Sequence, residues 1–193
     1  MTSIRSETGT LGQEVAQARF SRLYREQGRA ILAYALRRVK EPQDAADVVA
    51  ETFLVAWRRF DEVPVDDGAR LWLYATAGRV LANLQRSERR RTRLGARLAE
   101  TLRTEIATHR PPPGEAAEVV RAMAGLAPED RELLMLVSWD GLSPAEAARV
   151  LDLSALATRS RLHRARRRLR GLLEEREANG VGENREIDME EAR

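Results

Sequence analysis

A chain of 193 residues with a net charge of +3, 33% charged residues and 5% aromatic residues fits one domain or two small ones, rich in surface-exposed helices. The absence of cysteine excludes disulfides, thiolate metal sites and direct thiol sensing. No apolar run approaches the roughly 20 residues that span a bilayer, and the N-terminus lacks a signal-peptide pattern, so we expect a cytoplasmic protein.

The charge is distributed unevenly along the chain. Residues 174–193 contain eight acidic residues and three arginines, whereas the preceding 173 residues carry a net charge of +8. Such asymmetry favours contact between the body of the protein and nucleic acid. We expect the acidic tail, residues 176–193, to be disordered.

Apolar residues at helical spacing predict helices along most of the chain, and no segment shows the alternation of a strand. The predicted helices cover residues 14–39, 42–60, 69–94, 115–126, 128–139, 144–151 and 155–175. Three prolines and a glycine at 111–114 cannot continue a helix. The predicted fold is therefore all-α, with two small helical domains, 14–94 and 115–175, joined by a flexible linker at 95–114.

The predicted helix at 42–60 has a core side and an acidic side. We expect the core side to hold Ala45, Ala46, Val49, Phe53, Ala56 and Trp57. The opposite side carries Asp44, Asp47, Glu51 and Arg58, with Val48 and Val55 among them. Exposed valines within an acidic face suit a mixed apolar and charged protein interface, whereas a simple solubilising face fits the pattern slightly better.

The predicted helix at 69–94 also has two sides. Its core side is expected to hold Leu73, Tyr74, Ala77, Val80, Leu81 and Leu84. The other side presents Trp72, Thr76, Arg79, Asn83, Arg86 and Arg90. Because aromatic rings stack on bases and guanidinium groups bind the backbone, this stripe suits unpaired DNA. Trp72 taken singly fits core packing against Phe20 or Tyr24 better.

Residues 143–170 have the pattern of a helix-turn-helix. Ser143, Pro144 and Glu146 predict a capping box, and Ser154 caps a second helix with seven arginines and no acidic residue up to Arg170. Its buried stripe is predicted to be Thr158, Leu162, Ala165, Leu169 and Leu172. The opposite face holds Leu156, Arg159, Ser160, His163, Arg164 and Arg167, where such proteins touch base edges. A solvated basic helix would explain the arginines but not the cap, the turn and the segregated faces.

Three segments resemble, in order, the extracytoplasmic-function (ECF) sigma factors of bacteria. DAADVVAETFLVAW at 44–57 is similar to the family's core-polymerase-binding helix. RLWLYATAGRVLANLQRSERRR at 70–91 is similar to its promoter-melting and minus-ten segment. LSPAEAARVLDLSALATRSRLHRARRRL at 142–169 is similar to its minus-thirty-five helix-turn-helix. The resemblance covers about residues 14–173.

The resemblance implies a sigma factor, which binds core RNA polymerase and directs initiation at promoters without being an enzyme or needing a cofactor. The acidic face, Asp44, Asp47, Val48, Glu51 and Val55, would dock on the clamp helices of the largest polymerase subunit. The stripe on the helix at 69–94 and the loop at 61–68 would meet single-stranded minus-ten DNA. The outward face of the last helix would enter the minus-thirty-five major groove. The flap of the second-largest subunit and an anti-sigma factor are further partners that the resemblance suggests.

The sequence departs from the family pattern at three places. Ala50 replaces a common glutamine, Gly78-Arg79 replaces a frequent Arg-Asn pair, and Leu156 occupies a usual glycine position. Neither His109 nor His163 has a neighbouring nucleophile or metal-ligand cluster, so we expect neither an active site nor a metal site. Two other functions remain open: a dimeric helix-turn-helix repressor or activator that binds operator DNA without polymerase, and a protein that sequesters another regulator through its acidic helix.

Overall fold

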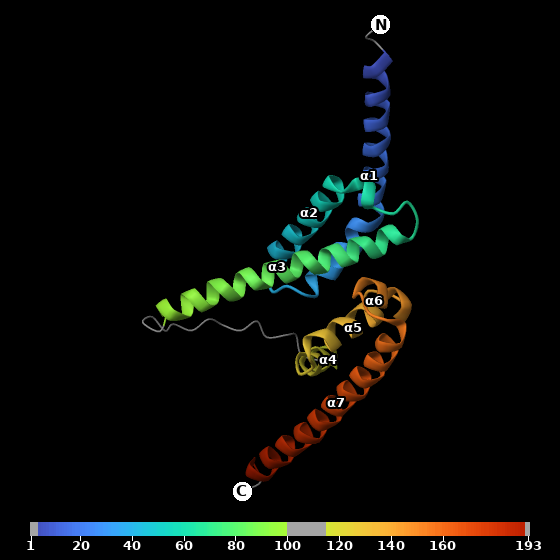
Figure 1. The fold of residues 1–193 in the computed structure, drawn as a ribbon. Coiled ribbons are helices and arrows are strands. Elements are labelled where there is room, and N and C mark those ends of the chain that lie inside the picture. Colours follow the sequence, from blue (N-terminus) through green and yellow to red (C-terminus); the bar gives the residue numbers. More distant parts are fainter. Residues whose placement is uncertain (1–3, 100–114, 192–193) are drawn as a thin grey trace. The chain divides into compact units, whose positions relative to one another are not determined.

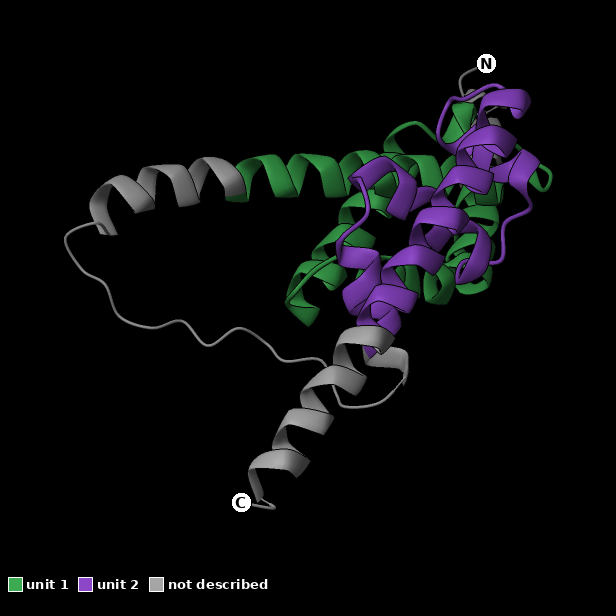
Figure 2. Ribbon diagram, turned by 90° about the horizontal axis from the view of Figure 1, so that it is seen from below, with its two compact units in different colours: residues 1–104 green, residues 105–193 purple. Residues whose placement is uncertain are grey.

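The computed structural model describes residues 4–99 and 115–191, and it describes the side chains of residues 14–88 and 118–176. Within these ranges the chain is helical and contains no strand (Figure 1). It divides into two compact units, residues 1–104 and 105–193 (Figure 2). The helices are α1 (Ile4–Leu36), α2 (Pro42–Arg58), the short 3₁₀ helix η1 (Phe60–Glu62), α3 (Gly68–Ala99), α4 (Glu115–Ala124), α5 (Pro128–Ser138), α6 (Pro144–Val150) and α7 (Ala155–Glu191).

Each predicted helix is present, and the differences lie at the ends. Helix α1 begins at Ile4, α3 continues to Ala99 and α7 continues to Glu191, all beyond their predicted limits. The turns added to α3 include Ala96, Arg97, Leu98 and Ala99, and those added to α7 include five glutamates and two arginines, all residue types with high helix propensity. The remaining linker residues, 100–114, and the side chains of the acidic tail beyond residue 176 lie outside the described part of the chain.

In the first unit α1, α2 and α3 pack against one another around an apolar core. Tyr34 of α1 and Tyr74 of α3 are both 2% exposed, and their rings meet edge to face with centroids 5.2 Å apart. Such a pair contributes about 0.5 to 1.5 kcal/mol beyond the burial of its area. The core therefore ties the end of α1 to the start of α3.

A second aromatic cluster joins α1 to the end of α2. The Phe20 ring lies edge-on to Trp57, with centroids 5.0 Å apart, and also meets Phe53 and Phe60. Trp57 is nevertheless 43% exposed, because the cluster lies at the edge of the helix pair. Core packing of Trp72 against Phe20 or Tyr24 was the alternative for Trp72, whereas the tryptophan that contacts Phe20 is Trp57.

In the second unit α7 packs on α4, α5 and α6, and α5 packs on α6. The core contains Leu133 and Leu136 of α5, Leu142 of the following turn, and Leu162 of α7. Arg131 donates hydrogen bonds to the carbonyls of Met123, Ala124 and Leu126 at the end of α4. Because the last carbonyls of a helix lack partners within it, these bonds fix the turn between α4 and α5.

Candidate nucleic-acid interface

The first helix of the helix-turn-helix begins with the predicted capping box. The Ser143 hydroxyl accepts the Glu146 backbone N–H at 3.3 Å, and the Ser143 N–H donates to the Glu146 carboxylate at 2.7 Å. Pro144 occupies the first helical position, where no backbone donor is needed. This part of the prediction is confirmed, and it sets where α6 starts.

Backbone hydrogen bonds that could not be predicted from the sequence hold the turn between α6 and α7. The Leu153 N–H donates to the Ala148 carbonyl at 2.9 Å, and the Asp152 N–H donates to Arg149 at 3.4 Å. Asp152 has a φ of 53°, the left-handed conformation that ends many helices. Ser154 then caps α7, with its hydroxyl accepting the Ala157 N–H at 3.2 Å. The turn thus fixes α7 relative to α6.

One side of α7 is buried as predicted. Thr158, Leu162 and Ala165 are at most 4% exposed, and Leu169 and Leu172 are half-buried. Thr158 satisfies its hydroxyl by donating to the Ser154 carbonyl at 3.0 Å. The burial of this stripe determines which side of α7 faces outward.

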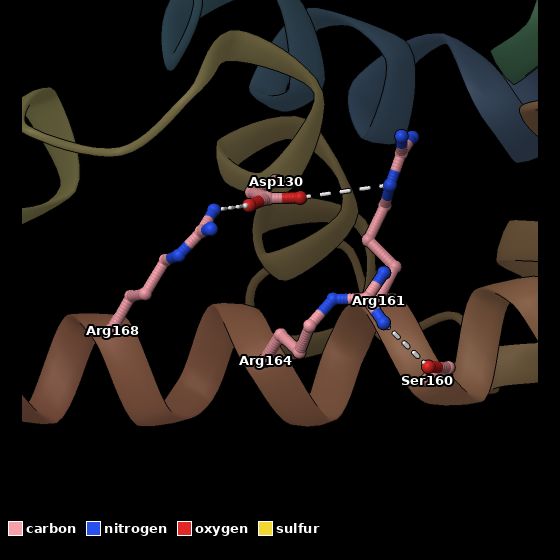
Figure 3. A network of polar contacts seen from close by, with 5 residues as sticks. All are labelled: Asp130, Ser160, Arg161, Arg164 and Arg168. Carbon is pink, nitrogen blue, oxygen red and sulfur yellow. Dashed lines mark hydrogen bonds and ion pairs between the residues drawn. The ribbon is translucent and has the colours of Figure 1, made fainter.

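The opposite side of α7 is exposed along its first three turns. All six residues of the predicted base-reading face are exposed: Leu156, Arg159, Ser160, His163, Arg164 and Arg167. Leu156 has 72% of its surface exposed, so this apolar side chain does not contribute to the core. The Arg164 guanidinium donates to the Ser160 hydroxyl at 2.7 Å, so it is already oriented along the face (Figure 3).

Two of the arginines on α7 contact a carboxylate of another helix. Arg161 and Arg168 form ion pairs with Asp130 of α5 (Figure 3). The sequence shows only that both arginines lie beside the buried stripe, and it gives no sign of the carboxylate 38 residues before Arg168. In this conformation both guanidinium groups are therefore engaged by a carboxylate within the same unit.

The predicted DNA stripe on α3 is only partly exposed. Arg79, Asn83 and Arg86 are exposed, and Arg86 donates a hydrogen bond to the Asn83 side chain. Trp72 is half-buried, and the side chain of Arg90 lies outside the described residues. The exposed part of the stripe thus begins at Arg79, about two turns later than predicted.

The prediction that Thr76 belongs to this stripe was wrong, because Thr76 is 4% exposed and belongs to the core. Helix α3 packs on both α1 and α2, so its first turns are buried over a wide arc that also includes Leu71, Leu73 and Ala77. Helical periodicity assumes one buried face, and it therefore places Thr76 wrongly outside. Its hydroxyl oxygen has no hydrogen-bond partner among the described residues.

The acidic face on α2 is rotated relative to the prediction. Val48 is 1% exposed and lies in a buried stripe with Ala45, Thr52, Phe53 and Ala56. The exposed residues Asp47, Glu51, Leu54 and Arg58 lie on the other side, whereas Asp44 and Val55 are half-buried. Thr52 is the reason for the difference: its hydroxyl donates to the Val48 carbonyl at 2.6 Å, so a polar residue can be buried. Two residues expected in the core, Ala46 and Trp57, are consequently exposed.

The loop between α2 and α3 is held by an arginine that the sequence does not single out. The Arg19 guanidinium donates to the carbonyls of Val63 at 2.6 Å and Pro64 at 3.2 Å, and lies 4.6 Å from the centre of the Phe60 ring. Asp66 accepts the Gly68 N–H at 2.8 Å at the start of α3. The loop that carries Asp61, Glu62 and Asp67 is thus anchored at both ends.

Among the described residues, no group of three or more histidine, aspartate or glutamate side chains is placed to hold a metal ion. No helix in the same part of the chain combines the length and apolar character needed to cross a membrane.

Two family models match the chain, each within one of the two units. The model described as sigma-70 region 2 matches residues 23–91, and that described as sigma-70, region 4, matches residues 116–169. The sigma factor NccH of Alcaligenes xylosoxydans xylosoxydans is 34% identical over 167 residues, covering 82% of this chain and 88% of the relative. The ECF sigma factor SigL of Mycobacterium tuberculosis is 33% identical over 172 residues, covering 85% and 94%.

Solved structures agree with these relatives. CnrH, in complex with the cytosolic domain of CnrY, is 30% identical with a TM-score of 0.61, and the match covers 86% of this chain and 96% of that one. RpoE of Bartonella quintana, in complex with the anti-sigma factor NepR, has a TM-score of 0.58 at 24% identity and supports the fold. The chain therefore belongs to the ECF group of the sigma-70 family of RNA polymerase sigma factors.

Proposed function

We propose that this sigma factor binds core RNA polymerase, directs it to promoters with two separate elements, and helps to open the element nearer the start. The observation that carries the proposal is the outward face of α7, where all six residues predicted to read bases are exposed while the opposite stripe is buried. Sigma factors bind RNA polymerase, and the outward face of α7 offers side chains that can recognise a promoter sequence.

The outward face of α7 suits the major groove of the upstream element. The guanidinium group of arginine can donate two hydrogen bonds to the two acceptors of guanine. The hydrogen bond to Ser160 orients the guanidinium group of Arg164 along this face. Leu156 offers an apolar contact of the kind that recognises a thymine methyl group. His163 lies between them on the same exposed side. The face therefore combines hydrogen-bonding and apolar readout.

The exposed part of α3 suits the unpaired strand near the start. Arg79 and Arg86 provide positive charge for the backbone, Asn83 provides an amide for base edges, and the half-exposed Trp72 provides an aromatic surface. Base stacking on an aromatic ring is worth about 1 to 3 kcal/mol, enough to help hold a melted base. We assign this role to these four residues, without Thr76, and to the anchored loop before α3.

The exposed stripe on α2 is the proposed contact with polymerase. Asp47, Glu51, Leu54 and Arg58 follow one another at spacings of four, three and four residues, so they share one side of the helix. This stripe replaces the predicted face, since its apolar member is Leu54 and not Val48. We assign it to the clamp helices of the largest polymerase subunit, and the second unit to the flap of the second-largest.

We assign the chain no catalytic step and no cofactor, and we place it in the cytoplasm, where bacterial polymerase transcribes. CnrH and RpoE are seen with the cytosolic domain of CnrY and the anti-sigma factor NepR, respectively. We therefore propose that an anti-sigma factor is a further partner of this chain.

Reconstituted transcription tests the proposal. The purified chain is added to core polymerase that lacks any sigma factor, together with a library of promoters, and transcript starts are mapped. We expect initiation at defined starts that share an upstream and a start-proximal sequence element. The absence of specific transcripts, with tight binding of the chain alone to symmetric DNA sites, would instead support the repressor or activator alternative.

A further inference from the structure

Asp130 is a buried carboxylate that the proposed promoter contacts do not use. It is the third residue of α5 and is 8% exposed. One of its oxygens accepts a hydrogen bond from the Arg168 guanidinium at 3.0 Å, and the other lies 3.6 Å from Nε of Arg161. Figure 3 shows the carboxylate between the two arginines, which reach it from separate turns of α7. A single acidic residue thus engages two cations of the DNA-facing helix.

The spacing of the two arginines explains how one carboxylate can engage both. Arg161 and Arg168 are seven residues apart, about two helical turns, so they lie on nearly the same side of α7. Ala165 lies between them and is fully buried. Both arginines therefore lie along the seam between α5 and α7, beside the core.

The neighbouring arginines behave differently. Arg164 bonds to Ser160 and is exposed, and Arg159 and Arg167 are exposed on the outward side. The side chain of Arg168 still has 63% of its surface exposed and that of Arg161 has 36%. Because both reach solvent, either guanidinium is free to turn toward a phosphate once the carboxylate no longer attracts it.

We infer that Asp130 is a positioning residue that withholds Arg161 and Arg168 from DNA phosphates. Each guanidinium that reaches a phosphate adds affinity that does not depend on sequence. Promoter choice depends on the ratio of specific to non-specific binding. Because Asp130 binds these two guanidinium groups, the base-reading residues contribute a larger share of the free energy of DNA binding. This inference rests on the proposed function, in which α7 faces the upstream element.

Binding of the complete chain, assembled with core polymerase, to two DNA duplexes tests the inference. One duplex carries the cognate promoter and the other carries the same promoter with a scrambled upstream element; both dissociation constants are measured at several salt concentrations. For Asp130→Asn we expect tighter binding to the scrambled duplex and a smaller ratio between the two. Two additional phosphate contacts steepen the slope of log affinity against log salt by up to about 1.8. This corresponds to about tenfold more affinity lost between 50 and 200 mM salt.

Control variants separate the withheld charge from a general role in folding. Asp130→Glu keeps the charge and should retain the wild-type slope. Combining Asp130→Asn with Arg161→Gln and Arg168→Gln removes the released cations and should restore both slope and discrimination. A helix that is merely loosened would not be repaired by losing two arginines. An unchanged slope in folded Asp130→Asn, or no restoration in the triple variant, would overturn the inference.

The double variant Arg161→Gln and Arg168→Gln keeps the test decisive if Asp130→Asn does not fold. With Asp130 in place, neither arginine should touch DNA, so we expect the wild-type slope. A slope shallower by about 1.8 would mean that both already bind phosphates, and the inference would be wrong. Failure of the wild-type complex to prefer the cognate promoter would be a different result, because it would overturn the proposed function itself.

Discussion

Arg159 and Arg164 lie on the exposed side of α7, and Arg164 is oriented by its bond to Ser160. Replacing either with alanine should cost about 1 to 3 kcal/mol of discrimination at one promoter position, because a bidentate contact with a base is lost. Filter binding and transcription with the assembled polymerase on single-base promoter variants measure this cost. Arg121→Ala, at an exposed position on α4, is the control and should change little. Loss of polymerase affinity in Arg159→Ala would contradict the separation of the two interfaces.

Thr76 distinguishes a core residue from a DNA contact. Its hydroxyl is buried and has no hydrogen-bond partner among the described residues. A buried hydroxyl without a partner costs about 1 to 3 kcal/mol, so Thr76→Val, which keeps the shape, should raise the free energy of unfolding. Thermal unfolding measures stability, and transcription on a defined promoter measures function. We expect a higher midpoint and unchanged initiation; reduced initiation with unchanged stability would return Thr76 to the DNA stripe.

The exposed stripe of α2 carries two acidic side chains, Asp47 and Glu51, at the proposed polymerase interface. Reversing the charge at Asp47 and Glu51 places two cations where the proposed interface has two anions. We expect weaker affinity for core polymerase with the helical content unchanged, since both side chains are exposed. Competition against a second sigma factor measures the affinity. Glu14→Arg on α1, also exposed and outside the proposed interfaces, is the matched control, and equal affinity in the double variant and the wild type would refute the assigned interface.

The turn between α6 and α7 depends on the backbone conformation of Asp152. Asp152 adopts a left-handed conformation that glycine adopts without strain. Asp152→Gly should therefore leave the second unit as stable or more stable, whereas Asp152→Val should destabilise it by about 1 to 2 kcal/mol. Denaturant unfolding compares the two variants. Equal stability of the valine variant would mean that the turn relaxes to another conformation, and upstream recognition should then change.

The helices differ in how far their faces follow from the sequence. On α7 the apolar and basic residues are cleanly separated, so the outward face could be predicted in full. On α2 the buried stripe includes Thr52, whose polarity conceals its burial, and the predicted face was wrong at Val48. Asp130 with Arg168 and Arg19 with Val63 join residues 38 and 44 positions apart, and helical periodicity holds no information on such contacts.

The whole molecule consists of two units, each with a core of its own. Tyr34, Leu73 and Tyr74 fill the first, and Leu133, Leu136 and Leu162 fill the second. Separate cores suit the proposed binding of two promoter elements, because each unit can keep its internal geometry when the DNA between the elements changes. The proposed positioning by Asp130 works within the second unit alone. Stability and promoter choice should therefore be coupled inside a unit more strongly than between units.

Leu133→Ala tests this independence. Leu133 is fully buried, and removing its side chain should cost about 2 to 5 kcal/mol because it leaves a cavity. Hydrogen exchange should accelerate in α5, α6 and α7, while α1, α2 and α3 keep the protection of the wild type. Leu73→Ala, fully buried in the first unit, is the reciprocal control and should show the opposite pattern. Accelerated exchange in both units of either variant would mean that the two cores unfold together, and upstream recognition would then depend on residues throughout the chain.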